Sequence, residues 1–66
     1  MQILVNEAAL AVDPPIAIGD LLARQGISPA GTAIALNDAM VPRSLWATTP
    51  LAEGDRLLVI RAARGG

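Results

Sequence analysis

The sequence predicts an α+β fold, in which one helix packs across one face of a mixed sheet of four to five strands. Three observations indicate this arrangement. Aliphatic side chains alternate between two faces in residues 1–6, and residues 56–61 contain four consecutive aliphatic residues; both patterns favour strands. Residues 17–25 have the apolar spacing of an amphipathic helix. Because this helix lies between strands along the chain, we expect it to cover a single face of the sheet.

The N-terminal segment is expected to form a hairpin. Residues 1–6 alternate between two faces, residues 6–8 suit a tight turn, and a second strand over residues 9–12 would turn Leu10 and Val12 inward. Pro14 and Pro15 end this pairing, because proline cannot donate to a strand ladder. If the first and last strands pair in parallel at the sheet centre, the C-terminal residues extend from the rigid part of the domain.

The predicted helix runs from Ala17 to about residue 25 and buries Ile18, Leu21 and Leu22 on one face. Asp20 lies in its first turn, where a negative charge suits the helix dipole. Ala17 is a poor N-cap, so we expect this end to fray. A glycine at position 26 ends the helix.

The second half of the chain contains two further predicted strands. Residues 33–36 form a short strand, followed by a turn at residues 37–38. Val41 is expected to be a strand end, because Pro42 cannot continue a central strand, and residues 43–46 are expected to form one helical turn. Gly54 is expected to adopt a positive φ in the turn before the last strand, residues 56–61. Leu57 and Val59 of that strand are assigned to the core. Trp46 is interpreted as a structural plug, with Arg43 stacked on it.

Three aliphatic residues are predicted to lie on the sheet face that the helix leaves open: Leu4, Leu58 and Ile60. Exposed aliphatic side chains grouped beside the C-terminal residues suit a surface that docks a partner protein. Arg61 and Arg64 are further candidate contacts, since their charges could guide the C-terminus toward acidic or phosphate groups.

The composition excludes several classes of function. The 66 residues include no cysteine, histidine or lysine, so the commonest general base and the commonest thiol and amine nucleophiles are absent. We therefore expect a protein that is not an enzyme, with no bound cofactor or metal. A net charge of −1 and a single aromatic residue argue against a nucleic-acid-binding module. With no signal peptide or apolar run long enough for a membrane span, we expect a cytoplasmic domain.

The chain ends in Gly65-Gly66, which we interpret as its functional site. Two residues without side chains allow a terminal carboxylate to enter a slot too narrow for a Cβ atom. Four or five extended residues reach roughly 15 Å, which is enough to thread a partner's active site. The predicted organisation is one domain over residues 1–60, followed by a flexible C-terminal tail over residues 61–66.

These features resemble the ThiS family, the sulfur carrier proteins of thiamine biosynthesis. The resemblance covers essentially the whole chain and is carried by four segments: Met1-Gln2-Ile3, Val41-Pro42-Arg43 with Trp46, Leu51 with Glu53-Gly54-Asp55, and Gly65-Gly66. The Val-Pro-Arg segment with its tryptophan discriminates this family from ubiquitin and the molybdopterin-synthase small subunit, which share the terminal glycines. Ala17 departs from the pattern, because the family commonly has Thr or Ser at this helix cap.

The resemblance implies a β-grasp, ubiquitin-like fold and a reaction at the C-terminus. A ThiF-type adenylating enzyme would use ATP to convert the Gly66 carboxylate into an acyl-adenylate, and Gly65 would provide steric clearance. Sulfur from a cysteine desulfurase, delivered as a persulfide, would then produce a thiocarboxylate. A ThiG-type thiazole synthase would receive that sulfur.

Three other functions remain open at this level. The chain could carry sulfur for molybdopterin synthesis, or it could be a ubiquitin-like modifier joined through Gly66 to lysines of other proteins. A β-grasp module for RNA is the third alternative, although the charge balance argues against it.

Overall fold

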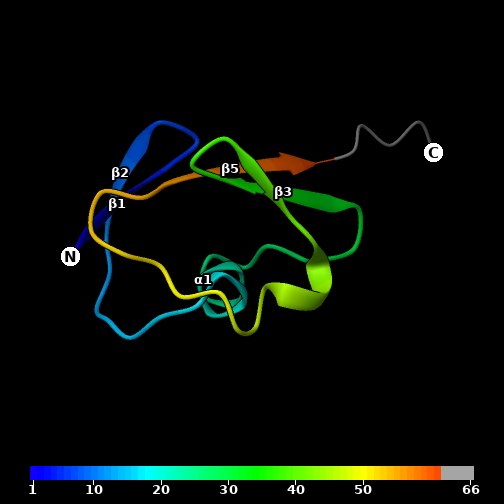
Figure 1. Ribbon diagram of the computed structural model, residues 1–66, viewed down its shortest axis with the longest axis horizontal. Coiled ribbons are helices and arrows are strands. Elements are labelled where there is room, and N and C mark those ends of the chain that lie inside the picture. Colours follow the sequence, from blue (N-terminus) through cyan, green and yellow to red (C-terminus); the bar gives the residue numbers. More distant parts are fainter. Residues whose placement is uncertain (62–66) are drawn as a thin grey trace.

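The computed structural model describes residues 1–61 and contains one mixed sheet with α1 packed against one of its faces (Figure 1). The sheet has five strands in the order β2-β1-β5-β3-β4. Their bounds are β1 Gln2–Val5, β2 Ala8–Ala11, β3 Thr32–Leu36, β4 Ala39–Val41 and β5 Arg56–Arg61. The two helical segments are α1 Ile18–Arg24 and the 3-10 turn η1 Arg43–Leu45. This architecture confirms the predicted α+β class and its single covering helix.

The last strand of the chain is the central strand of the sheet. β5 pairs in parallel with β1, where Val5 lies opposite Leu57, and antiparallel with β3, where Thr32 lies opposite Arg61. The outer pairs β1–β2 and β3–β4 are antiparallel hairpins. The parallel pairing of the first and last strands is therefore confirmed, and β5 is supported by a neighbour on each side.

Two asparagine turns close the hairpins with almost the same backbone. Asn6 and Glu7 have φ of 49° and 71°, while Asn37 and Asp38 have φ of 50° and 72°. Two consecutive residues with positive φ are typical of the type I′ turn, whose twist matches that of the flanking strands, and asparagine tolerates this conformation well. The strand β4 that follows the second turn extends the sequence prediction, which assigned only Val41 there.

The core lies between α1 and the sheet. Its fully buried side chains come from β1, β3, α1 and the segment before α1: Ile3, Ile16, Ile18, Leu21 and Ile34. Leu57 and Val59 of β5 are also buried, as predicted, and Leu22 completes the apolar face of the helix. Leu10 and Val12 are half-buried and pack against this core.

The N-terminus of α1 is held in place, so the expectation that it frays is wrong. Ala17 has no side-chain acceptor, but its own amide donates to Oδ2 of Asp20 at 3.0 Å. The next amide, that of Ile18, donates to the carbonyl oxygen of Thr49 at 3.0 Å. Because a distant loop supplies acceptors for the first helical N–H groups, a capping side chain is not needed here.

The C-terminus of α1 ends at a glycine, as predicted. Gly26 has φ of 70°, its amide donates to Ala23, and the amide of Ile27 donates to the carbonyl of Leu22 at 2.8 Å. These two bonds form a Schellman motif, which satisfies carbonyl groups at the helix end. The motif turns the chain toward β3.

The chain leaves the described region at the end of the central strand. β5 includes Arg61, so the first residue assigned to the predicted tail is the last residue of the strand. Arg64, Gly65 and Gly66 lie outside the described residues. Within residues 1–61, neither helical segment is long and apolar enough to cross a membrane.

Candidate functional site

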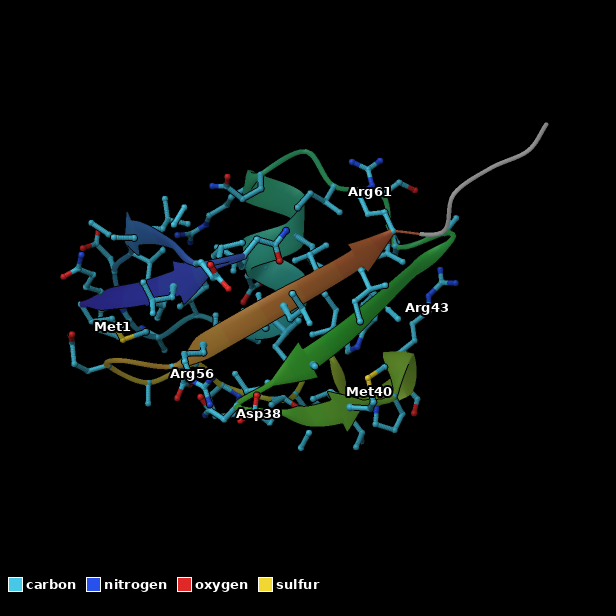
Figure 2. The ribbon with its side chains drawn as sticks, turned by 90° about the horizontal axis from the view of Figure 1, so that it is seen from above. Met1, Asp38, Met40, Arg43, Arg56 and Arg61 are labelled. Carbon is cyan, nitrogen blue, oxygen red and sulfur yellow. The ribbon has the colours of Figure 1, made fainter. Side chains whose placement is uncertain are left out.

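The candidate site is organised around the C-terminal end of β5, to which residues 62–66 are attached. Figure 2 shows Arg61 at this end of the strand, with Arg43 at the same end of the molecule. Arg56 lies at the opposite end of β5, where its guanidinium forms an ion pair with Asp38 at 2.7 Å. The arginines nearest the attachment point are therefore separate from the one that pairs with a carboxylate.

An apolar surface, here called the open-face patch, covers the sheet face opposite α1. It consists of Leu4, Leu58 and Ile60, as predicted, together with Met40 of β4. Leu58 is 49% exposed, Ile60 43% and Met40 62%, whereas Leu4 is half-buried. Figure 2 views this face and shows Met40 at its β4 edge. The sequence analysis therefore predicted three of the four residues of this patch.

Met40 was missed because β4 was not recognised as a strand. Met40 lies opposite Ala35 of β3, which in turn lies opposite Leu58 of β5. Side chains at directly opposed positions share a face of the sheet. Residues 39–41 are all apolar, and a run of three apolar residues is too short to identify a strand.

A shallow groove lies within the open-face patch, between β1 and β5. Leu4 and Leu58 line this groove of about 180 Å³, and its polar rim includes Glu7, Asp38 and Arg56. The small side chains of Ala33 and Ala35 lie in β3 opposite Ile60 and Leu58, respectively. An apolar floor with a charged rim is the usual composition of a protein-docking surface.

Trp46 lies on the other side of the sheet and is a structural residue. Its side chain is only 5% exposed, and Nε1 donates to the carbonyl oxygen of Val41 at 2.8 Å. Arg43 is exposed and lines two shallow hollows together with Trp46. The burial of Trp46 confirms its interpretation as a structural plug, and its hydrogen bond also joins the end of η1 to β4.

The carboxylates of the described residues do not gather into a metal-binding cluster. Within residues 1–61, no group of three or more His, Cys, Asp or Glu side chains is placed to hold a metal ion. The carboxylates of Asp20 and Asp55 instead accept backbone hydrogen bonds, from Ala17 at 3.0 Å and from Ala52 at 2.7 Å. Asp20 therefore caps the N-terminus of α1, and Asp55 stabilises the turn before β5.

Comparison with known proteins decides the family. The chain matches the family model described as the ThiS family over residues 2–66, a match that includes both terminal glycines. The chain belongs to the ThiS family. This membership confirms the resemblance carried by the opening strand, the Val41-Pro42-Arg43 segment with Trp46, and Gly65-Gly66.

Individual relatives agree with this membership. The chain is 35% identical to the sulfur carrier protein ThiS of Escherichia coli strain K12 over 66 residues, which covers all of both chains. Its fold matches the crystal structure of a ThiS thiamine biosynthesis protein from Geobacter metallireducens, with a TM-score of 0.84, 23% identity and full coverage of both chains. A solution structure of a thiamine biosynthesis protein from the same organism matches with a TM-score of 0.80 and 23% identity, covering all of this chain and 88% of the other. The β-grasp fold expected for a ThiS protein is thereby confirmed.

Proposed function

We propose that this chain carries sulfur for thiazole formation on the carboxyl carbon of Gly66. As a ThiS-family protein it is a sulfur carrier of thiamine biosynthesis, and it serves partner enzymes as a substrate without itself being a catalyst. One structural observation supports the assignment to the C-terminus: β5 is the central strand, and residues 62–66 follow its last residue directly. The central strand of the sheet therefore leads directly to the end of the chain.

The chemistry of the terminus explains why activation is needed. A free α-carboxyl group has a reference pKa of about 3.3–3.7, so it is ionised at neutral pH and is a poor acyl donor. In the proposed reaction, a carboxylate oxygen of Gly66 attacks the α-phosphorus of ATP and displaces pyrophosphate. A persulfide sulfur then attacks the acyl-adenylate and displaces AMP, which gives an acyl disulfide between the two proteins. A second thiol of the sulfur-delivering protein attacks that protein's own sulfur in this bond, so that a disulfide forms there and the thiocarboxylate is released.

The composition protects the activated terminus from its own chain. The sequence has no lysine or cysteine, so no side-chain amine or thiol can attack an acyl-adenylate at Gly66. The remaining amine, at Met1, donates to the carbonyl oxygen of Val12 at 2.8 Å. It lies at the end of the sheet opposite Arg61, as Figure 2 shows. An intramolecular side reaction is therefore disfavoured by both composition and geometry.

The proposed partners are a ThiF-type adenylating enzyme that uses ATP, a cysteine desulfurase that supplies sulfur, and a ThiG-type thiazole synthase that receives it. The open-face patch, defined above, is the proposed docking surface for the adenylating enzyme. Arg61 and Arg64 are proposed to contact acidic or phosphate groups near that enzyme's active site. Gly65, which has no side chain, is proposed to let the terminus pass through a narrow entrance to that site. Because the activating step consumes ATP, we place the carrier in the cytoplasm.

Intact-mass analysis tests the proposal directly. The chain is incubated with its adenylating enzyme, ATP, cysteine and the desulfurase, and we expect one oxygen to be replaced by sulfur. A matched variant that lacks Gly66 should fold normally, as judged by circular dichroism, but should gain no sulfur. A mass that never changes under these conditions would refute the assignment. Recovery of conjugates to other proteins from cells would instead indicate a ubiquitin-like modifier.

A further inference from the structure

The outer half of β5 extends beyond the strand that flanks it on one side. β1 reaches only to Val5, opposite Leu57, and the chain then reverses through the turn at Asn6 and Glu7. On the other side, β3 accompanies β5 to Arg61, which lies opposite Thr32. Residues 58–61 of β5 therefore have a strand neighbour on the β3 side only. This segment carries the C-terminal residues.

The side chain of Asn6 occupies the place where β1 would have continued. The backbone amide of Asn6 donates to the carbonyl of Leu57 at 2.9 Å. Its side-chain Oδ1 accepts from the amide of Val59 at 2.8 Å, and Nδ2 donates to the carbonyl of Val59 at 3.4 Å. One residue thus binds three successive backbone groups on the open edge of β5. Its side-chain amide replaces the peptide group of a missing strand residue.

We infer that Asn6 is a positioning residue, which holds the last residues of β5 in strand conformation and thereby presents the C-terminus to the activating enzyme. The inference rests on the proposed function. From Val59 to Gly66 the chain spans at most about 25 Å when extended, so the direction of β5 at Val59 governs where the terminus can reach. A segment that is already ordered loses less conformational entropy when it enters a partner's site.

The second asparagine turn provides a matched control within the same chain. Asn37 has φ of 50°, compared with 49° for Asn6, and it contacts the other end of β5. Its Oδ1 accepts from the amide of Arg56 at 2.9 Å, and its Nδ2 donates to Oδ1 of Asp55 at 3.0 Å. Replacing either asparagine with glycine removes side-chain hydrogen bonds while keeping the positive φ accessible. Only the Asn6 bonds lie next to the segment that carries the C-terminus.

The experiment compares Asn6→Gly, Asn37→Gly and Asn6→Asp with the natural chain. The first readout is hydrogen exchange at the Val59 amide, which requires no partner. We expect Asn6→Gly to lose protection at Val59 selectively, Asn37→Gly to retain it, and Asn6→Asp to retain most of it because its carboxylate still accepts this bond. Unchanged protection at Val59 in Asn6→Gly would overturn the inference, whether or not the chain carries sulfur.

The second readout is the ATP–pyrophosphate exchange catalysed by the activating enzyme, measured against carrier concentration. For Asn6→Gly we expect KM to rise about tenfold with kcat nearly unchanged, which corresponds to about one residue that must be newly ordered on binding. Asn37→Gly should stay within about twofold, and Asn6→Asp should lie closer to the natural chain. Equal effects in the two glycine variants, or none in either, would overturn the inference. Failure of the natural chain to support exchange would refute the proposed function instead, leaving the hydrogen-exchange result to decide the role of Asn6.

Discussion

At the scale of single residues, Trp46 is a residue of the family motif whose role is structural. The indole is 5% exposed and its N–H reaches the carbonyl of Val41, the last residue of β4. Pro42 follows directly and cannot donate to a strand ladder, so β4 ends at Val41. Trp46 therefore donates a hydrogen bond to the backbone carbonyl at the end of the edge strand β4. Its role is to join η1 to the sheet, and it does not belong to the open-face patch that is proposed as the docking surface.

Replacing Trp46 with phenylalanine should test this role. We expect Trp46→Phe to lower the free energy of unfolding by about 1–3 kcal/mol, because the Val41 carbonyl loses its partner and the smaller ring leaves a void. Urea denaturation followed by circular dichroism measures the change without requiring indole fluorescence. Leu45→Ala, at the adjoining exposed position, should change stability by less than about 0.5 kcal/mol. Equal stability of the two variants would contradict the structural role.

At the scale of elements, α1 illustrates that a short helix depends on its surroundings. A helix of seven residues is too short to be stable by itself in water. Its amides at Ile18 and Gly19 donate to the carbonyls of Thr49 and Trp46, each at 3.0 Å. The helix N-terminus is thus stabilised by carbonyl groups that lie 27 and 31 positions further along the chain. The loop between η1 and β5 is consequently part of the helix cap.

The contribution of Asp20 should be modest for the same reason. We expect Asp20→Ala to lower the free energy of unfolding by about 0.5–1 kcal/mol, through loss of the bond to Ala17 and of the favourable dipole interaction. The Ile18 amide should remain protected from hydrogen exchange, since its acceptor is the carbonyl of Thr49. Asp13→Ala makes the same charge change outside the helix and serves as the control. Loss of protection at Ile18 in Asp20→Ala would show that the loop does not cap the helix independently.

At the scale of the whole molecule, the two sheet faces have different tasks. One face buries the core against α1, while the other presents the open-face patch beside the strand that leads to Gly66. β5 belongs to both, because Leu57 and Val59 point into the core and Leu58 and Ile60 point outward. The same strand therefore anchors the fold, contributes two residues to the proposed docking surface and carries the terminus.

Replacing Leu58 should weaken docking without unfolding the domain. Leu58 and Leu45 are both 49% exposed, but only Leu58 belongs to the open-face patch. We expect Leu58→Glu to raise the KM of the adenylating enzyme for the carrier by about tenfold or more, as for a central residue of an interface. Leu45→Glu should leave that KM nearly unchanged. Circular dichroism checks that both variants are folded. Similar KM values for the two variants would exclude the patch as the docking surface.

Much of this molecule follows from local patterns in the chain. The four consecutive aliphatic residues at positions 57–60 predict the last strand. Because a strand has only two faces, one pair of them must face the core and the other pair the open face. The helical spacing of Ile18, Leu21 and Leu22 predicts the buried face of α1. The absence of thiol and amine side chains, together with Gly65-Gly66, directs attention to the terminal carboxylate. Each of these inferences depends on residues that are close neighbours in sequence.

Only the tertiary structure determines the contacts between residues that lie far apart along the chain. Asn6 and Val59 are 53 positions apart, and nothing near Asn6 indicates that its amide binds the central strand. Thr49 caps a helix whose own cap residue is an alanine, and Met40 joins the patch only once β4 is paired with β3. Local propensity specifies which element a segment forms, but the partner of a polar group is chosen only when the elements pack together.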